Sequence, residues 1–145
     1  MTTLDQILST WEKDSIIDKT DPGGELINIP KIHAKYVRYL SEHSLAAKKA
    51  GWDLNKMKKI KIEYYNGRLD AHELKKYGWE PFKFILKADI AAYLEADQDI
   101  INIQMKKALH DETIAVCNFI LKELSNRTWQ LKEYCSWEKF INGQH

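Results

Sequence analysis

The chain has 145 residues, of which 44% are hydrophobic and 30% are charged. This length and balance fit one soluble domain with a sizeable core and exclude a disordered chain. No apolar run approaches the ~20 residues of a membrane span. The start, MTTLDQIL, lacks the basic and apolar regions of a secretory signal, so we expect a cytoplasmic protein. Two cysteines provide no disulfide framework.

The net charge of +1 conceals an uneven distribution of charge along the chain. Residues 1–30 carry two basic and six acidic side chains, a net charge of −4. Residues 31–76, which we call the basic band, carry twelve basic and five acidic side chains, a net charge of +7. Residues 77–145 carry eight basic and ten acidic side chains. A concentrated band of this kind is typical of proteins with a polyanionic partner.

The first predicted element is a short helix at the N-terminus. Thr3 and Gln6 form a capping-box pattern ahead of apolar residues at helical spacing. The stretch TDPGGELIN, residues 20–28, combines Pro and Gly signals and predicts a loop. A second helix is predicted to begin near Pro30, because proline is tolerated in a first helical turn.

The stretch NKMKKIKIEYYNGR, residues 55–68, fits two structures. As a strand, Lys59 and Lys61 alternate with Ile60 and Ile62 on opposite faces. As a helix, an apolar stripe forms at a spacing of three and four residues, from Leu54, Met57, Ile60 and Tyr64. We favour the helix, ending in a C-cap at Asn66 and Gly67, with Gly51 as a possible bend upstream.

The second half of the chain also has helical periodicity. Residues 69–82 predict an irregular connection with a short helix, capped by Asp70 and Glu73. Residues 82–95 and 99–142 are each predicted to be helical. Asn126 and Thr128 are weak helix formers, so the last segment fits either one helix or two.

Apolar residues in the last segment form a seam at alternating steps of four and three, which is typical of helix association. We expect the seam to be an oligomer interface that consists of Ile114, Cys117, Leu121, Leu124 and Leu131. The predicted fold class is therefore all-α, a small helical domain with a basic middle and a long C-terminal oligomerisation region. The expected division is a DNA-binding region at 1–96 and an oligomerisation region at 97–145.

The stretch MKKIKIEYYNGRLD, residues 57–70, resembles the UvsY family of recombination mediators of T4-type bacteriophages. The shared pattern is spaced basic residues, an acidic residue, a Tyr-Tyr pair, a small polar residue and Gly-Arg. LKADIAAYLEAD and RTWQLKEYCSWEKFING are similar to later segments of the family in apolar spacing. The resemblance covers most of the chain after the first thirty residues.

The resemblance implies a helical protein that assembles into a ring of six or seven subunits and binds single-stranded DNA. It also implies that the protein helps to load a RecA-like recombinase against a single-strand-binding protein, with no catalysis and no cofactor. The family's two DNA-linked basic positions correspond to Lys59 and Lys61. The second is usually an arginine, so lysine here keeps the charge but loses a planar, bidentate donor.

The residues themselves support a nucleic-acid site, because each neutralised phosphate releases counterions without any reading of sequence. The candidate DNA-binding residues are Lys56, Lys58, Lys59, Lys61, Tyr65 and Arg68. Base stacking has four candidate aromatic residues, Tyr39, Trp52, Tyr64 and Tyr65. The alternative interpretation is a solvated lysine face over an aromatic core, and Tyr64 fits the core better than a contact.

Other functions have weaker support in the sequence. The five histidines lack the spacing of a zinc motif, and no Gly-rich loop precedes a lysine as in nucleotide-binding loops. Asp97, Asp99 and Asp111 are explained as a solvated helix face, which leaves a nuclease without a metal cluster. A helical oligomeric adaptor, whose basic band binds acidic protein surfaces, remains the alternative to a mediator.

Overall fold

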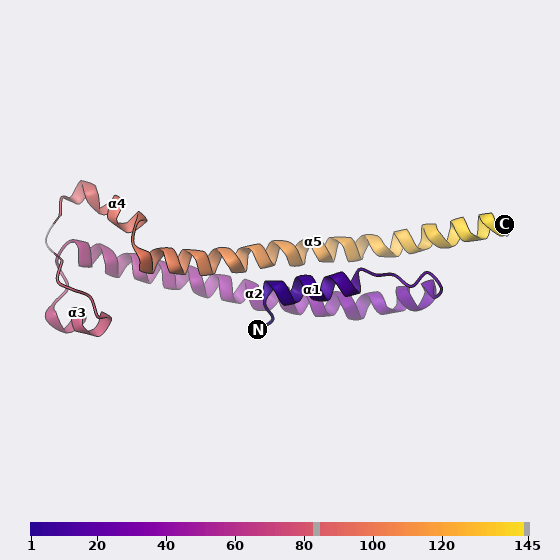
Figure 1. The fold of residues 1–145 in the computed structure, drawn as a ribbon, viewed down its shortest axis with the longest axis horizontal. Helices are drawn as coiled ribbons and strands as arrows, with labels where there is room; N and C mark the ends of the chain where they lie inside the picture. Colours follow the sequence, from indigo (N-terminus) through magenta and orange to yellow (C-terminus); the bar gives the residue numbers. More distant parts are fainter. Residues whose placement is uncertain (83–84, 144–145) are drawn as a thin grey trace. The chain divides into compact units, whose positions relative to one another are not determined.

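The computed structural model describes residues 1–82 and 85–143. Its described elements are all helical, which confirms the predicted all-α class (Figure 1). They are α1 (Leu4–Asp14), α2 (Pro22–Tyr65), α3 (Ala71–Tyr77), the 3-10 turn η1 (Lys87–Asp89), α4 (Ile90–Glu95) and α5 (Gln98–Ile141). None of the helices in this part of the chain is both long and apolar enough to cross a bilayer.

The chain forms two compact units. Unit 1 consists of Met1–Leu45 and Leu109–His145, and unit 2 consists of Ala46–Ala108. Helices α2 and α5 each contribute one part to each unit. These units do not coincide with the division at residue 96 that we expect from function, and that division stays a prediction.

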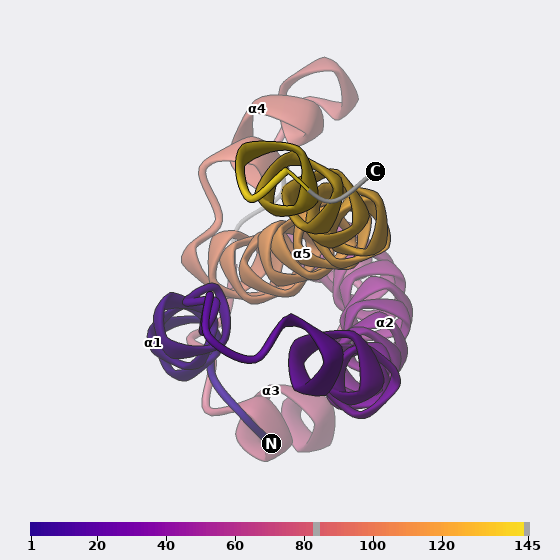
Figure 2. The same cartoon turned by 90° about the vertical axis from the view of Figure 1, so that its right-hand side faces the viewer.

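Helix α1 begins as its capping box predicts. Thr3 Oγ1 accepts a hydrogen bond from the Gln6 backbone at 3.2 Å, and the Thr3 backbone donates to Gln6 Oε1 at 3.0 Å. Ile7 on this helix is fully buried. It contributes to the core of unit 1 together with Ile32, Tyr36, Cys117, Ile120 and Leu124. Figure 2 shows α1 and the first part of α2 nearly end-on, with the last part of α5 above them in this view.

Helix α2 begins eight residues before the position that the sequence predicts. Asp21 Oδ1 accepts a hydrogen bond from the Gly24 backbone at 3.1 Å, which caps the helix, and Pro22 occupies its first position. The predicted loop over 20–28 is therefore wrong for most of its length. Pro30 lies inside the helix.

The 55–68 stretch forms the end of α2, which confirms the helical interpretation. Helix α2 is continuous through Gly51. Gly67 adopts a left-handed conformation with φ of 71°, and the Arg68 backbone donates to the Glu63 carbonyl at 2.9 Å. This Schellman-type arrangement ends the helix close to the predicted C-cap.

The described part of the connection between α2 and α5 contains three short helical pieces. Helix α3 carries the predicted capping box, because Asp70 Oδ1 accepts from the Glu73 backbone at 2.8 Å, and Gly78 ends it with φ of 70°. The predicted helix over 82–95 is reduced to η1 and α4 in its described part. Helix α5 is then one continuous helix without a break at Asn126 or Thr128.

Two buried histidines join α2 and α5 in unit 1, although the sequence places them 67 residues apart. The Nδ1 atoms of His43 and His110 are 2.9 Å apart, and His43 Nε2 lies 2.7 Å from the Thr2 carbonyl oxygen. Because a carbonyl only accepts, His43 Nε2 carries the proton of that contact, and in neutral His43 the Nδ1 atom then accepts from His110 Nδ1. This contact attaches the N-terminus to the helix pair.

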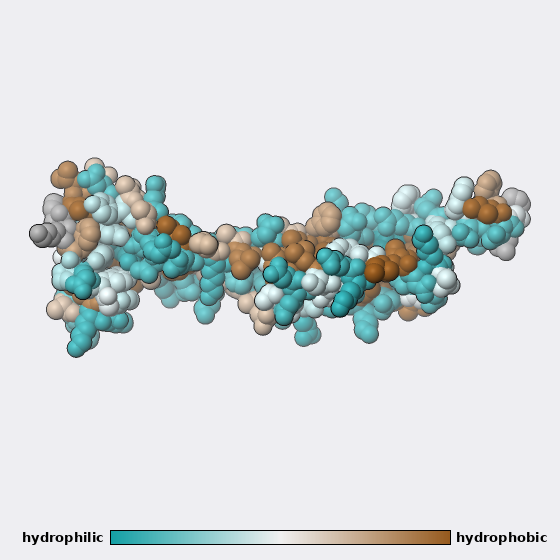
Figure 3. All heavy atoms as spheres, in the orientation of Figure 1, coloured by the Kyte–Doolittle hydropathy of each residue, from teal (hydrophilic) through white to brown (hydrophobic). Residues whose placement is uncertain are grey.

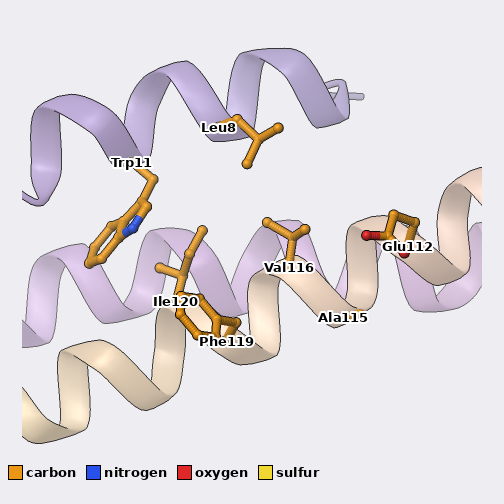
Figure 4. A pocket seen from close by; sticks show the side chains of 7 residues that line it. All are labelled: Leu8, Trp11, Glu112, Ala115, Val116, Phe119 and Ile120. Carbon is orange, nitrogen blue, oxygen red and sulfur yellow. The ribbon is translucent and has the colours of Figure 1, made fainter.

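Unit 1 also has an apolar cleft of about 340 Å³ between α1 and α5 (Figure 4). Its lining residues are Leu8, Trp11, Glu112, Ala115, Val116, Phe119 and Ile120. Trp11 at one end is held by Arg127, whose guanidinium carbon lies 5.5 Å from the ring centroid. Arg127 Nη2 also donates to the Asp14 carbonyl at 2.9 Å, so one buried arginine satisfies a carbonyl at the end of α1.

Candidate nucleic-acid interface

The last four turns of α2 carry cations that are exposed or half-buried. Lys56 and Lys59 are exposed and Lys58 is half-buried, while Arg68 is exposed just beyond the helix end. Residues 56 and 59 are three positions apart and therefore share one helix face. These four predicted DNA-binding residues lie within one short segment, on a surface that water reaches. The face drawn in Figure 3 is mainly hydrophilic, with apolar groups scattered over it.

Lys61 differs from the other lysines because its side chain points into unit 2. The residue is only 5% exposed, and its ammonium forms ion pairs with Asp97 at 3.0 Å and Asp99 at 2.8 Å. It also lies 3.9 Å from the centroid of the Trp79 ring. With two carboxylates and an aromatic face already around it, this ammonium is not presented to a phosphate. We therefore revise the expected role of Lys61 from DNA contact to support of the segment that carries Lys56 and Lys59.

Tyr65 is likewise placed in the interior rather than on the surface. It is 8% exposed, and its hydroxyl donates to Asp97 Oδ2 at 2.5 Å. Its ring packs edge-on against Phe82, with centroids 5.0 Å apart. A hydroxyl and ring engaged in this way are not available for base stacking in this conformation.

Tyr64, which the sequence assigns to the core, is half-buried at the edge of the same aromatic cluster. Its hydroxyl donates to the Glu80 carbonyl oxygen at 2.7 Å, and its ring lies 5.1 Å from that of Trp79. The cluster consists of Tyr64, Tyr65, Trp79, Phe82 and Tyr93. These ring contacts pack the chain after α2 back against the end of the helix.

Asp97 is the shared partner of the buried polar groups in unit 2. It is 6% exposed, and besides Tyr65 and Lys61 it accepts a hydrogen bond from the Ile100 backbone at 3.1 Å, which caps the start of α5. The predicted solvated face is therefore wrong for Asp97. Its position three residues before Ile100, at the start of an apolar run, is the local signal that identifies it as an N-cap.

The pKa values of this interior follow from its contacts. Burial acts to raise the pKa of Asp97, but hydrogen bonds from Tyr65, the Ile100 backbone and Lys61 outweigh it and hold the pKa below 3.8. Burial acts to lower the pKa of Lys61, but its bonds to Asp99 and Asp97 outweigh it and raise the pKa above 10.5. Both groups are therefore charged at neutral pH.

The predicted oligomer seam lies mostly in the interior of unit 1. Cys117 and Leu124 are fully buried and Leu131 is 2% exposed. Ile114 and Leu121 are half-buried, and Leu121 packs against the core. The heptad-like spacing therefore reflects packing of α5 within one chain, and the three buried side chains are not available to a second subunit.

In the described part of the chain no group of three or more His, Cys, Asp or Glu residues is arranged to hold a metal ion.

Comparison with known proteins shows the family of the chain. A family model described as "Recombination, repair and ssDNA binding protein UvsY" matches residues 10–144. The chain belongs to the UvsY family. The resemblance leaves out the first thirty residues, whereas the family match begins at residue 10 and includes most of the acidic N-terminal region.

Solved structures of the UvsY family share the fold. One crystal structure of the bacteriophage T4 recombination mediator protein UvsY, lattice type IV, superposes with a TM-score of 0.82 at 20% identity, covering 94% of this chain and 98% of the other. A second, lattice type II, gives 0.73 at 21% identity, covering 98% and 99%. No curated protein sequence matches at comparable significance.

Proposed function

We propose that this protein is a recombination mediator that binds single-stranded DNA through the exposed basic residues at the end of α2. It then promotes loading of a RecA-like recombinase onto strands covered by a single-strand-binding protein. The observation that supports this most is the exposed set Lys56, Lys59 and Arg68, in a chain whose family is described by recombination, repair and single-strand binding. The role is binding and exchange, without catalysis.

Lysines on a helix face suit a protein that must act on any sequence. Each phosphate contact releases counterions and gives affinity that is independent of the bases. The buried pair of Lys61 and Asp97 holds the end of α2, so that the exposed lysines keep a fixed spacing. We assign Lys58, which is half-buried, to the edge of this surface.

We further propose that the protein assembles into a ring of six or seven subunits, as the resemblance implies. Repeating a weak basic surface around a ring raises overall affinity by roughly 10²–10⁴ without new contacts. The exposed side of α5 offers large apolar residues for such an interface, because Trp129 is 65%, Trp137 59% and Phe140 65% exposed. Leu121 and Ile114 are the seam residues that are half-buried and therefore retain some exposed surface.

The proposal is tested by two measurements on the full chain. Binding of a labelled single strand is titrated at several salt concentrations, and ATP turnover of a RecA-like recombinase is measured on strands already covered by a single-strand-binding protein. A mediator binds strands with a steep salt dependence and raises the turnover, because it favours the recombinase filament over the covered strand. Strand binding without stimulation leaves only a coating protein, and binding to acidic proteins but not to strands supports the adaptor.

Replacing both Lys56 and Lys59 by Gln is expected to reduce the salt dependence of strand binding. Two lost phosphate contacts lower the slope of log affinity against log salt by about 1.4, at ~0.7 per contact on single strands. The matched control replaces two exposed lysines of α5, Lys132 and Lys139, by Gln. Equal slopes for the two double variants would remove Lys56 and Lys59 from the site.

A further inference from the structure

Trp52 is a large aromatic residue in an unusual position, on the outer face of α2 within unit 2. It is 63% exposed. Four exposed lysines lie near it on the helix. Two precede it by four and three positions, Lys48 and Lys49, and two follow it by four and seven positions, Lys56 and Lys59. Residues at these spacings share the face of a helix, so the indole is surrounded by ammonium groups along the helix.

The other three aromatic candidates for base stacking are already occupied. Tyr39 packs edge-on against Tyr36 with centroids 5.6 Å apart, and Tyr64 and Tyr65 belong to the aromatic cluster of unit 2. Within residues 1–82 and 85–143, no aromatic ring packs against Trp52. Its ring is thus the one of the four whose face remains open to a ligand.

The surroundings indicate which ligand this ring suits. Four cations along about 16 Å of helix, from Lys48 to Lys59 at 1.5 Å per residue, match a chain of phosphates. The nearest acid in sequence, Asp53, lines a cleft that also contains Lys56 and Lys106, so two lysines offset its charge there. A double helix hides the faces of its bases, whereas a single strand exposes them to stacking, so an open indole between phosphate-binding groups favours single strands.

We propose that Trp52 is a base-stacking residue for single-stranded nucleic acid, with Lys48, Lys49, Lys56 and Lys59 holding the phosphates on either side. This inference rests on the proposed function and adds a contact that phosphate binding alone does not supply. An acidic protein surface would use the same lysines but has no unpaired base to cover the indole. The ring therefore distinguishes the two classes of partner.

The test compares Trp52→Ala with Phe119→Ala, a matched control whose aromatic ring is 61% exposed on α5 and is not part of the proposed subunit interface. Both are measured with a labelled oligothymidylate and with an abasic strand of equal length and charge. Trp52→Ala is expected to weaken oligothymidylate binding by roughly 5- to 150-fold, the effect of one lost stack. The salt slope stays unchanged because no phosphate contact is lost, and Trp52→Tyr keeps most of the affinity. On the abasic strand Trp52→Ala binds as the wild type does.

Each outcome decides between the proposals. If the wild type binds no strand, the proposed function fails, and the stacking role fails with it. If the wild type binds but Trp52→Ala behaves like Phe119→Ala, the function stands and stacking by Trp52 is wrong. Equal losses on the abasic strand also overturn stacking, since that strand has no base to lose. Circular dichroism of each variant shows whether the helix is intact.

Discussion

Replacing Asp97 by Ala is expected to lower the free energy of unfolding by about 3 kcal/mol, measured by urea denaturation. Removing one partner of a buried ion pair typically costs ~3–5 kcal/mol, because the remaining charge stays buried. Here the side chains of Lys61 and Asp97 are 6% and 4% exposed. Asp99 still pairs with Lys61 in this variant, which sets the lower end of the range, while the Tyr65 hydroxyl and the Ile100 backbone lose their acceptor.

The control for this prediction is Asp99→Asn. The Asp99 side chain is 48% exposed, so water screens its pair with Lys61 and we expect a loss of under about 1 kcal/mol. Equal losses for the two variants would contradict the central role of Asp97.

Acid provides an independent readout of the same contact. The pKa of Asp97 is lowered in the folded chain, so its stabilising effect is present above 3.8 and is lost as the pH falls through the lowered value. The acid limb of stability in the wild type should therefore be flatter in Asp97→Ala.

Replacing Leu124 by Asp is expected to unfold unit 1 rather than to dissociate an oligomer. The side chain is fully buried in the core beside Cys117 and Ile120, and a carboxylate there has no partner. Even Leu124→Ala should cost about 2–5 kcal/mol, because it leaves a cavity. The measurement is thermal unfolding followed by circular dichroism, together with native mass.

Leu45→Ala is the matched control, because this leucine is 65% exposed on α2 and its truncation leaves no cavity. We expect a change within about 0.5 kcal/mol for it. A Leu124→Asp protein that keeps its helical signal and stability but forms smaller assemblies would show that the seam lies between subunits after all.

Family and fold class were both accessible from the sequence, because they depend on patterns that extend along much of the chain. Helical periodicity and few glycines or prolines predicted all-α, and the YYNGR core indicated the UvsY family. Lys56, Lys59 and Arg68, three of the candidate DNA-binding residues, are exposed, and their role in binding stays a prediction. Lys61 was expected on the same surface but is buried. Whether a position on α2 is exposed depends on which other part of the chain packs against it.

The sequence by itself determined the helix caps, because each cap is formed by residues that are close together in the chain. The capping boxes at Thr3 with Gln6 and at Asp70 with Glu73 close over three residues, and the Gly67 C-cap closes over five, so their residue types suffice. The start of α2 was misjudged even so, because Pro30 and Pro22 are both acceptable first residues and only the Asp21 cap separates them.

Only the tertiary structure decided which residues of the basic band and of the seam are free. Lys61 and Tyr65 both bind the carboxylate of Asp97, which lies more than thirty residues later in the chain. Cys117 and Leu124 pack in one core with Ile7, which lies more than one hundred residues earlier. A helical stripe specifies that a face is buried but not by which partner, because packing against α1 and packing against a second subunit require the same apolar spacing.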